Sequence, residues 1–270
     1  AVSEASLGPD AAKPYFRKRF LLPTPPETEL DREKMVKHQE RIEAAGLDPS
    51  FRGHNHSPSL EVCPNGDLVL AIFTSYTEYE PEMSLMGSRL RFGADAWDMP
   101  SSFLDCPGVC DNTPLLWNDQ GKLYLFWAWS RAIGGGPFQW IVSEDNGASW
   151  SEVQFPRLHG AIGGFSRQPI NRAFRVSDGT IYVPSDAVGG ASLLWASRDD
   201  MGTWFDTGGR SAGRHTVYCE LRDGRLLGMG GKNTDIEGYM PKALSSDGGK
   251  TWTVSKTSFP ALAVNQRPSL

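Results

Sequence analysis

Long apolar segments are absent from this sequence, and no block of like charge interrupts it. A membrane-spanning helix needs about 18 or more consecutive apolar residues, so no membrane span is expected. The 27 basic and 32 acidic residues give a net charge of −5 and are mixed along the chain. Without a basic stripe or patch, a nucleic-acid partner is not expected either.

Cysteine is scarce, with four residues among 270. Cys106 and Cys110 are close enough to pair on one loop, but four separate thiols are the alternative because so few cysteines seldom form a disulfide framework. No Cys/His cluster has the spacing of a zinc site. The glycines at 134–136 lack the strand-to-helix setting of a phosphate-binding loop. We therefore expect no metal and no cofactor.

Glycine, proline and tryptophan are abundant instead, with 29, 19 and 9 residues. This composition is typical of many strands joined by tight turns. One such turn is residues 245–252, SSDGGKTW, where Asp247 can accept backbone hydrogen bonds and two glycines can take the positive φ of a hairpin turn. The same phrase recurs at 143–150 (SEDNGASW), more loosely at 197–204 (SRDDMGTW) and in degenerate form at 91–97.

These four segments end at tryptophans 97, 150, 204 and 252, at steps of 53, 54 and 48 residues. A repeat of that length predicts an array of similar supersecondary units. Each unit also contains a glycine turn between two apolar strands, in residues 60–70, 115–126, 173–183 and 217–227. Such turns are strong hairpin signals. Each unit is therefore predicted to be a four-stranded antiparallel sheet.

The repeats predict an all-β fold, a β-propeller of four-stranded antiparallel blades. The predicted blades are residues 54–107, 108–165, 166–212 and 213–262, with a partial fifth from 263. About four and a half blades would then occupy residues 53–270, so we expect either a fragment of a longer propeller or another element in the gap. Residues 1–52 are predicted to form an N-terminal extension with a short helix in 29–45.

The Ser-x-Asp-x-Gly-x-Thr/Ser-Trp turn resembles the Asp box (BNR repeat) of the sialidase, or neuraminidase, superfamily, and the likeness covers residues 53–270. It implies a six-bladed, sialidase-like propeller with an active site where the innermost strands begin, joined by the loops between second and third strands. Those strand starts converge on the propeller axis, so side chains from several blades can meet there. The likeness also implies a structural role, on the opposite rim, for the box residues Asp145, Trp150, Asp199, Trp204, Asp247 and Trp252.

The strand starts and adjoining loops are rich in residues suited to acidic-glycan chemistry. Histidine exchanges protons near neutral pH, a carboxylate can assist glycoside cleavage, and arginine can bind a carboxylate or sulfate. The predicted catalytic residues are His56, His215, Glu78 and Asp111. The predicted substrate-binding residues are His54, Asn112, Trp129, Arg172, Lys232, Tyr239 and Arg267. The alternative is that these residues form only the polar lining that the axis of any propeller carries.

Further polar residues belong to the same strand starts and loops, namely Tyr76, Glu80, Glu82, Arg131, Asn171, Asp186, Arg214, Asp235 and Gln266. Side chains alternate along a strand, so Arg214 and His215 are expected to point in opposite directions.

Three functions fit these residues. The resemblance implies an exo-acting glycoside hydrolase on an acidic or modified glycan, yet His56 stands where the family has an arginine, and His215 stands where it has a glutamate. A polysaccharide lyase with a histidine or tyrosine base and arginine neutralisation is the first alternative. A non-catalytic glycan-binding propeller is the second. In each case the partner is a glycan and the expected location is secreted or periplasmic, with any signal peptide already removed before Ala1.

Overall fold

The computed structural model describes residues 3–4, 15–16, 21, 40–41, 44, 54–75, 77–78, 83–130, 135–262 and 267–269. The helix predicted within 29–45 lies almost wholly outside them, although Glu40, Arg41 and Ala44 are helical. Strands β1 (Ser3–Glu4) and β2 (Tyr15–Phe16) pair in parallel ahead of the main fold. Across the described residues, no helix is both long enough and apolar enough to cross a membrane.

Two antiparallel sheets form the first half of the main fold, and we call them blades one and two. Blade one has the order β3 (His54–Val62), β4 (Leu68–Ser75), β5 (Ser84–Leu90) and β6 (Ser101–Leu104). Blade two has the order β7 (Asp111–Asp119), β8 (Lys122–Trp129) and β9 (Gln139–Ser143). An isolated bridge between Trp140 and Gln154 lies at the position of a fourth strand in blade two.

Blades three and four form the second half. Blade three contains β10 (Phe165–Pro169), β11 (Phe174–Arg175), β12 (Ile181–Ala187), β13 (Ser192–Ser197) and β14 (Phe205–Asp206), with β10 and β11 both paired to β12. Blade four has the order β15 (Val217–Glu220), β16 (Leu226–Met229), β17 (Tyr239–Ser245) and β18 (Thr253–Pro260). Four antiparallel sheets in series confirm the all-β prediction.

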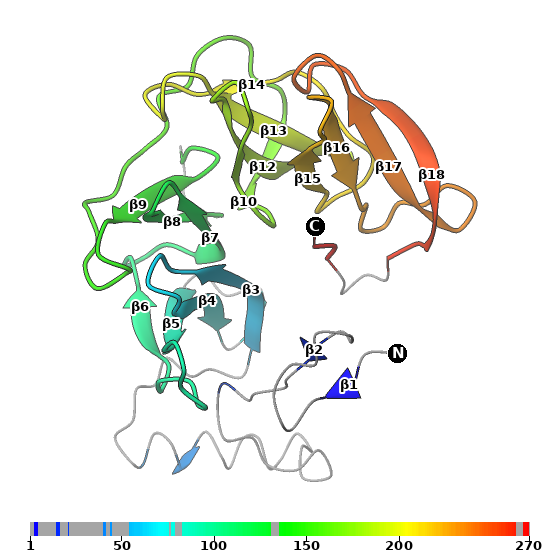
Figure 1. Ribbon diagram of the computed structural model, residues 1–270. Coiled ribbons are helices and arrows are strands. Elements are labelled where there is room, and N and C mark those ends of the chain that lie inside the picture. The colour runs from blue at the N-terminus through cyan, green and yellow to red at the C-terminus, as the bar shows by residue number, and fades with distance from the viewer. Residues whose placement is uncertain are drawn as a thin grey trace.

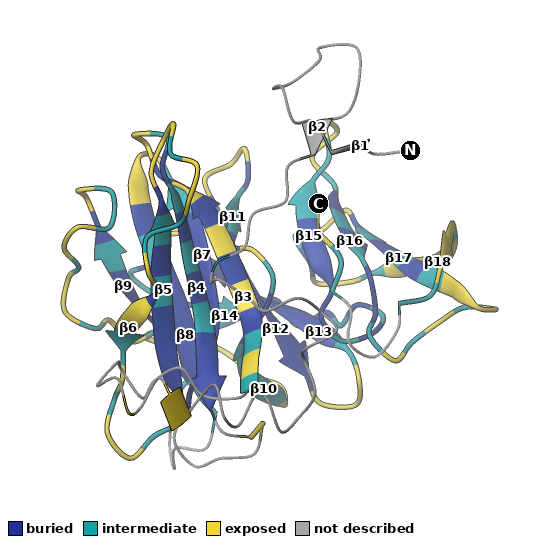
Figure 2. Ribbon diagram, turned by 90° about the horizontal axis from the view of Figure 1, so that it is seen from below, coloured by how far each residue is buried: buried dark blue, intermediate teal, exposed yellow. Residues whose placement is uncertain are grey.

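The four blades follow an open arc rather than a closed ring (Figure 1). Strands β3, β7, β10 and β15 line the inner side of the arc, and β6, β9, β14 and β18 lie toward the outside. Strands β12 and β13 of the central part are buried along their whole length, whereas β3 alternates and β18 is mostly exposed (Figure 2). Blades one and four, which have a neighbouring blade on one face only, are therefore more exposed than the central blades.

Apolar side chains between neighbouring blades form the core. One cluster joins blades one and two, with Phe73 and Leu85 facing Leu125 and Trp127. A second joins blades two and three around Trp195, and a third joins blades three and four. Because each sheet packs face to face against the next, the cores hold the inner strand starts of successive blades close together.

The repeated Ser-x-Asp turns close the third hairpin of blades two, three and four. At Asp247, Ser245 Oγ donates to Oδ1 at 2.8 Å, and Thr251 donates from its N–H at 2.9 Å and from its hydroxyl at 2.6 Å. Asp145 and Asp199 accept the corresponding hydrogen bonds. Hydrogen bonds from the Ser or Thr four residues later hold the pKa of each of these carboxyls at about 2.

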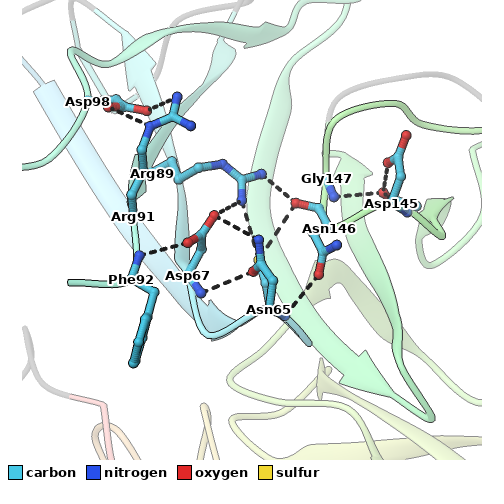
Figure 3. A network of polar contacts seen from close by, with 11 residues as sticks. Asn65, Asp67, Arg89, Arg91, Phe92, Asp98, Asp145, Asn146 and Gly147 are labelled. Carbon is cyan, nitrogen blue, oxygen red and sulfur yellow. Dashed lines mark hydrogen bonds and ion pairs between the residues drawn. The ribbon is translucent and has the colours of Figure 1, made fainter. Parts of the chain in front are cut away.

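These turns also dock onto the preceding blade, as Figure 3 shows for blades one and two. The Asn146 carbonyl accepts from Arg89 Nη2, and Asn146 Oδ1 accepts from the Asn65 N–H at 3.1 Å. Arg89 is held in turn by Asp67, at 2.8 Å from Nη1. Since the turns lie at the ends of the inner strands opposite His54 and Asp111, this rim faces away from the predicted site.

Candidate active site

The inner strands of all four blades carry the same unusual backbone near their start. Ser57, Thr113, Asn171 and His215 have φ values of 54°, 47°, 64° and 59°. In blades one, two and four this residue lies two positions before the residue at which the inner strand pairs regularly with the second strand. A non-glycine residue in this region costs on the order of 1–3 kcal/mol and is common at functional sites. The strand starts are thus a set of strained positions that sequence alone did not reveal.

The positive φ at His215 brings two neighbouring side chains to one carboxylate. Asp186, near the end of β12, is fully buried. Its Oδ2 accepts from Arg214 Nε at 2.9 Å, and its Oδ1 accepts from the His215 N–H at 2.8 Å. His215 Nδ1 lies 3.1 Å from Oδ1 and 3.0 Å from Oδ2. The expectation that Arg214 and His215 point in opposite directions is therefore wrong, because the strand is not regular at this residue.

The pKa shifts fix the roles within this pair. Burial alone would raise the pKa of Asp186, but hydrogen bonds and charge from His215, with a further hydrogen bond from Arg214, hold it below its usual value. Burial lowers the pKa of His215, although Asp186 opposes the shift. At neutral pH the pair is a carboxylate beside a neutral imidazole. A carboxylate at Nδ1 keeps the proton on that nitrogen and leaves Nε2 as a base.

A partly buried arginine from the C-terminal segment links blade four to blade one. Arg267 Nη2 donates to Ser57 Oγ at 2.7 Å. After burial, the positive charge of Arg267 is the largest cause that lowers the pKa of His56, and it also lowers that of His215. The strand starts of blades one and four therefore meet around Arg267, and the local charge favours an anion.

The next predicted residues lie at the edge of this cluster. Glu78 Oε1 is 3.9 Å from His56 Nδ1, and both side chains are partly exposed. His54 packs edge-on against His56 with ring centroids 5.5 Å apart, and its buried Nε2 has no hydrogen-bond partner. Lys232 donates its backbone N–H to the Arg214 carbonyl at 2.7 Å, and its charge reaches His56.

Asp111 begins β7, the inner strand of blade two, and is enclosed. One oxygen accepts from the indole N–H groups of Trp127 and Trp129, both at 2.8 Å, and the other accepts from the Cys106 N–H at 2.7 Å. Burial raises the pKa of Asp111 to about 6. With both oxygens bonded and no exposed surface, Asp111 is placed to orient Trp129, which stays half-buried near the strand start. Its predicted catalytic role stays a prediction.

Other predicted binding residues lie apart from the cluster. Arg172 Nη2 is 3.5 Å from Glu61 Oε2, and Glu61 lies five residues beyond His56 on β3, so the guanidinium lies toward the other end of that strand. Tyr239 begins an outer strand and carries Lys256 Nζ 5.5 Å from its ring centroid. Asn112 is buried and accepts from the Thr113 hydroxyl at 3.2 Å. The loop candidates Tyr76, Glu80, Glu82, Arg131 and Gln266 lie outside the described residues.

Sequence reasoning underrated several supporting residues. Asp186 was one loop candidate among many, although it proves to be the partner of His215. Asn171 donates from Nδ2 to the His215 carbonyl at 2.8 Å, and Ser57 holds Arg267. Cys106 and Cys110 do not form a disulfide, and neither do the other two cysteines. Among the described residues, no group of three or more His, Cys, Asp or Glu is arranged to hold a metal ion.

Comparisons with known proteins agree with this fold. The family model "BNR repeat-like domain" matches residues 66–266. Similar solved structures include a Dyadobacter fermentans protein of unknown function, at 17% identity and a TM-score of 0.60 over 77% of this chain and 70% of that one. The Hadza microbial sialidase Hz136 is 16% identical with a TM-score of 0.61, over 78% of this chain and 47% of that one. The NanB sialidase of Streptococcus pneumoniae is 11% identical with a TM-score of 0.61, over 82% of this chain and 54% of that one. Comparison with curated proteins finds no match.

Fold and strand arrangement define a sialidase-like β-propeller. The chain belongs to the BNR repeat-like domain family, because the family model covers well over half of it. It spans about half the length of the two sialidases it resembles, at 47% and 54%. At these low identities the similarity establishes the fold alone.

Proposed function

We propose that this chain forms the glycan-processing part of a carbohydrate-active enzyme, an exo-acting glycoside hydrolase on an anionic glycan. The observation that carries the proposal is the His215–Asp186 pair beside the partly buried Arg267. A histidine base held in one tautomer can activate the attacking water, and a nearby guanidinium can bind the anionic group of the sugar. The sialidase-like fold supports the same reaction class.

In this proposal Arg267 binds the carboxylate or sulfate of the sugar, with Ser57 orienting the guanidinium. His215 Nε2 takes a proton from the attacking water, and Asp186 stabilises the imidazolium that forms. The His56–Glu78 pair faces the same space and supplies the proton for the leaving oxygen. Such proton transfers typically contribute about 10²–10⁴-fold to a rate.

A second candidate is a polysaccharide lyase, and one specific observation favours it. Two carboxylates of the strand starts and loops, Asp186 and Asp111, are fully buried and hydrogen-bonded. The proposed base, His215, is a histidine, whereas most glycoside hydrolases use a pair of carboxylates. In elimination from a uronate, Arg267 would neutralise the carboxylate and His215 would remove the C5 proton. The C4–O bond then breaks, a C4–C5 double bond forms, and the leaving oxygen takes a proton from His56.

The products distinguish the two reactions. Purified protein is incubated with sialylated, uronate-containing and sulfated glycans, and the products are followed by ultraviolet absorbance and by reducing-end assay. Hydrolysis yields a new reducing end without unsaturation, and elimination yields an absorbing unsaturated uronate at the new non-reducing end. Binding of these glycans without turnover would exclude both reactions and leave a glycan-binding propeller.

We further propose that the protein works in a secreted or periplasmic setting. Polymeric anionic glycans do not cross membranes unaided, so an enzyme that trims them is expected where they occur. Cell fractionation with detection of the intact protein tests this placement.

A further inference from the structure

A cavity of about 220 Å³ lies on the rim opposite the candidate active site, between the outer strands of blade one and the Ser-x-Asp turn of blade two. Trp150 and Phe103 form an aromatic wall, with ring centroids 5.3 Å apart in an edge-on arrangement. Ser101, Ser102 and Asp98 stand along the opening. The cavity lining is thus partly aromatic and partly polar.

The tryptophan of this turn differs from its counterpart in the next blade. Trp204 is fully buried among aromatic residues of blades two and three. Trp150 remains half-buried and lines the cavity, although the hydrogen bonds of the two turns are alike. The turn therefore does not require the opening beside Trp150.

Gly87, in the interior of β5, lines the cavity and leaves room for the Phe103 ring. Its φ is not among the positive ones, so its backbone does not demand glycine. A Cβ at this position would meet three atoms of the Phe103 side chain at 3.3 Å. A glycine inside a strand often marks a place where a ligand or another backbone approaches closely.

The floor of the cavity is rigid. Arg89 lines it and is fixed by Asp67 at 2.8 Å and by the Asn146 carbonyl (Figure 3). A Cβ on Gly147 would lie 3.0 Å from Arg89 Nη2 and 3.4 Å from Trp150 Cζ2, so these groups are already in close contact. Asp98 is partly exposed and pairs with Arg91 at 3.0 Å. A site that is formed in advance loses little ordering entropy on binding.

We propose that this cavity is a second, non-catalytic binding site for a neutral sugar residue. The apolar face of a sugar ring packs against Trp150 and Phe103, while its hydroxyl groups bond to Ser101, Ser102 and the Asp98 carboxylate. Both carboxylates are paired, Asp98 with Arg91 and Asp67 with Arg89, so neither arginine is left to hold a uronate. The site therefore selects the opposite kind of sugar from the candidate active site, and it stands whether or not the proposed catalysis does.

Fluorine NMR of the full chain labelled with 5-fluorotryptophan tests the proposal. The Trp150 resonance is assigned with Trp150→Phe. Methyl glycosides of glucose, galactose and N-acetylglucosamine are then titrated to high millimolar concentration, with methyl glucuronide as the charged counterpart. At least one neutral glycoside should shift the Trp150 resonance saturably, and methyl glucuronide should shift it at least several-fold less.

Ser102→Leu narrows the opening from an exposed position on β6 and should abolish the shift. Ser255→Leu makes the same change on β18, the corresponding strand of blade four, and should leave it intact. Turnover on any substrate should be equal in both variants, since neither position is near His215. A Trp150 resonance that no neutral glycoside moves, or a shift that survives Ser102→Leu, would overturn the proposal.

Discussion

The two ends of the blades repeat in opposite ways. On the rim, blades two, three and four repeat both sequence and contacts, so that Asp145, Asp199 and Asp247 accept the same hydrogen bonds. At the inner strand starts only the backbone repeats, with positive φ in all four blades. The side chains there differ from blade to blade, as His215 and Thr113 do. Repetition of side chains therefore marks the scaffold, and repetition of backbone with changing side chains marks the candidate site.

The largest expected effect separates catalysis from folding at the strand starts. His215→Asn keeps a residue that tolerates positive φ and can donate to Asp186, but it removes the titrating base. We expect kcat to fall by about 10²–10⁴-fold, with the unfolding midpoint nearly unchanged. The measurement is steady-state turnover on the glycan that the product assay identifies, with urea unfolding in parallel.

His159→Asn is the matched control. His159 is exposed, lies between blades two and three, and packs on Phe205 with ring centroids 5.5 Å apart. Its replacement should leave turnover within a few-fold of the parent. Equal losses of turnover in the two variants would mean that the loss is not specific to His215.

The next effect concerns two tryptophans from the same motif. Trp204 is fully buried, so Trp204→Ala should lower the free energy of unfolding by about 3–5 kcal/mol. Trp150→Ala should cost clearly less because that side chain is half-buried beside a cavity. Urea unfolding followed by circular dichroism compares them. Equal costs would show that burial does not distinguish the two turns.

The sequence predicted the scaffold better than the site, and the reason is physical. Turn chemistry is local, so Ser245, Asp247 and Thr251 reveal their hydrogen bonds through their spacing alone. The site depends on contacts between distant segments, such as Arg267 with Ser57 and His215 with Asp186. Side chains also cease to alternate where φ is positive, and no local sequence pattern predicts the positive φ of His215. Sequence could name the histidines, but it could not pair them.

A smaller effect tests whether the rim is purely structural. Ser245 is 2% exposed and accepts from the Gly249 N–H at 2.9 Å. Ser245→Ala leaves that donor unpaired and should cost about 1–3 kcal/mol of unfolding free energy. The kcat of the folded variant should equal that of the parent. Ser255→Ala, on an exposed face, is the control and should change stability by less than about 0.5 kcal/mol. A change in kcat for Ser245→Ala would show that the rim turns affect the candidate active site.

The smallest effect is a pH dependence that the two ends share with opposite signs. On the rim, hydrogen bonds lower the pKa of Asp145, Asp199 and Asp247 to about 2. Their stabilisation is present above the unfolded value, which is about 3.9, and is lost as the pH falls toward 2. In the candidate site, burial raises the pKa of Asp111 to about 6, and its contribution has the reverse direction.

As the pH falls, Asp111 takes up a proton near pH 6 in the folded state. In the unfolded chain it does so only near pH 3.9, which is about two pH units lower. The parent should therefore gain stability relative to Asp111→Asn as the pH falls from 7 to 4. His56 and His215, whose pKa values are lowered, act in the opposite direction but contribute equally to both proteins and cancel in the difference. Urea unfolding of the two proteins at several pH values measures that difference. If the difference in unfolding free energy between the two proteins does not change across this range, Asp111 is either already protonated at neutral pH or solvated there. In either case a buried charge on Asp111 does not hold Trp129.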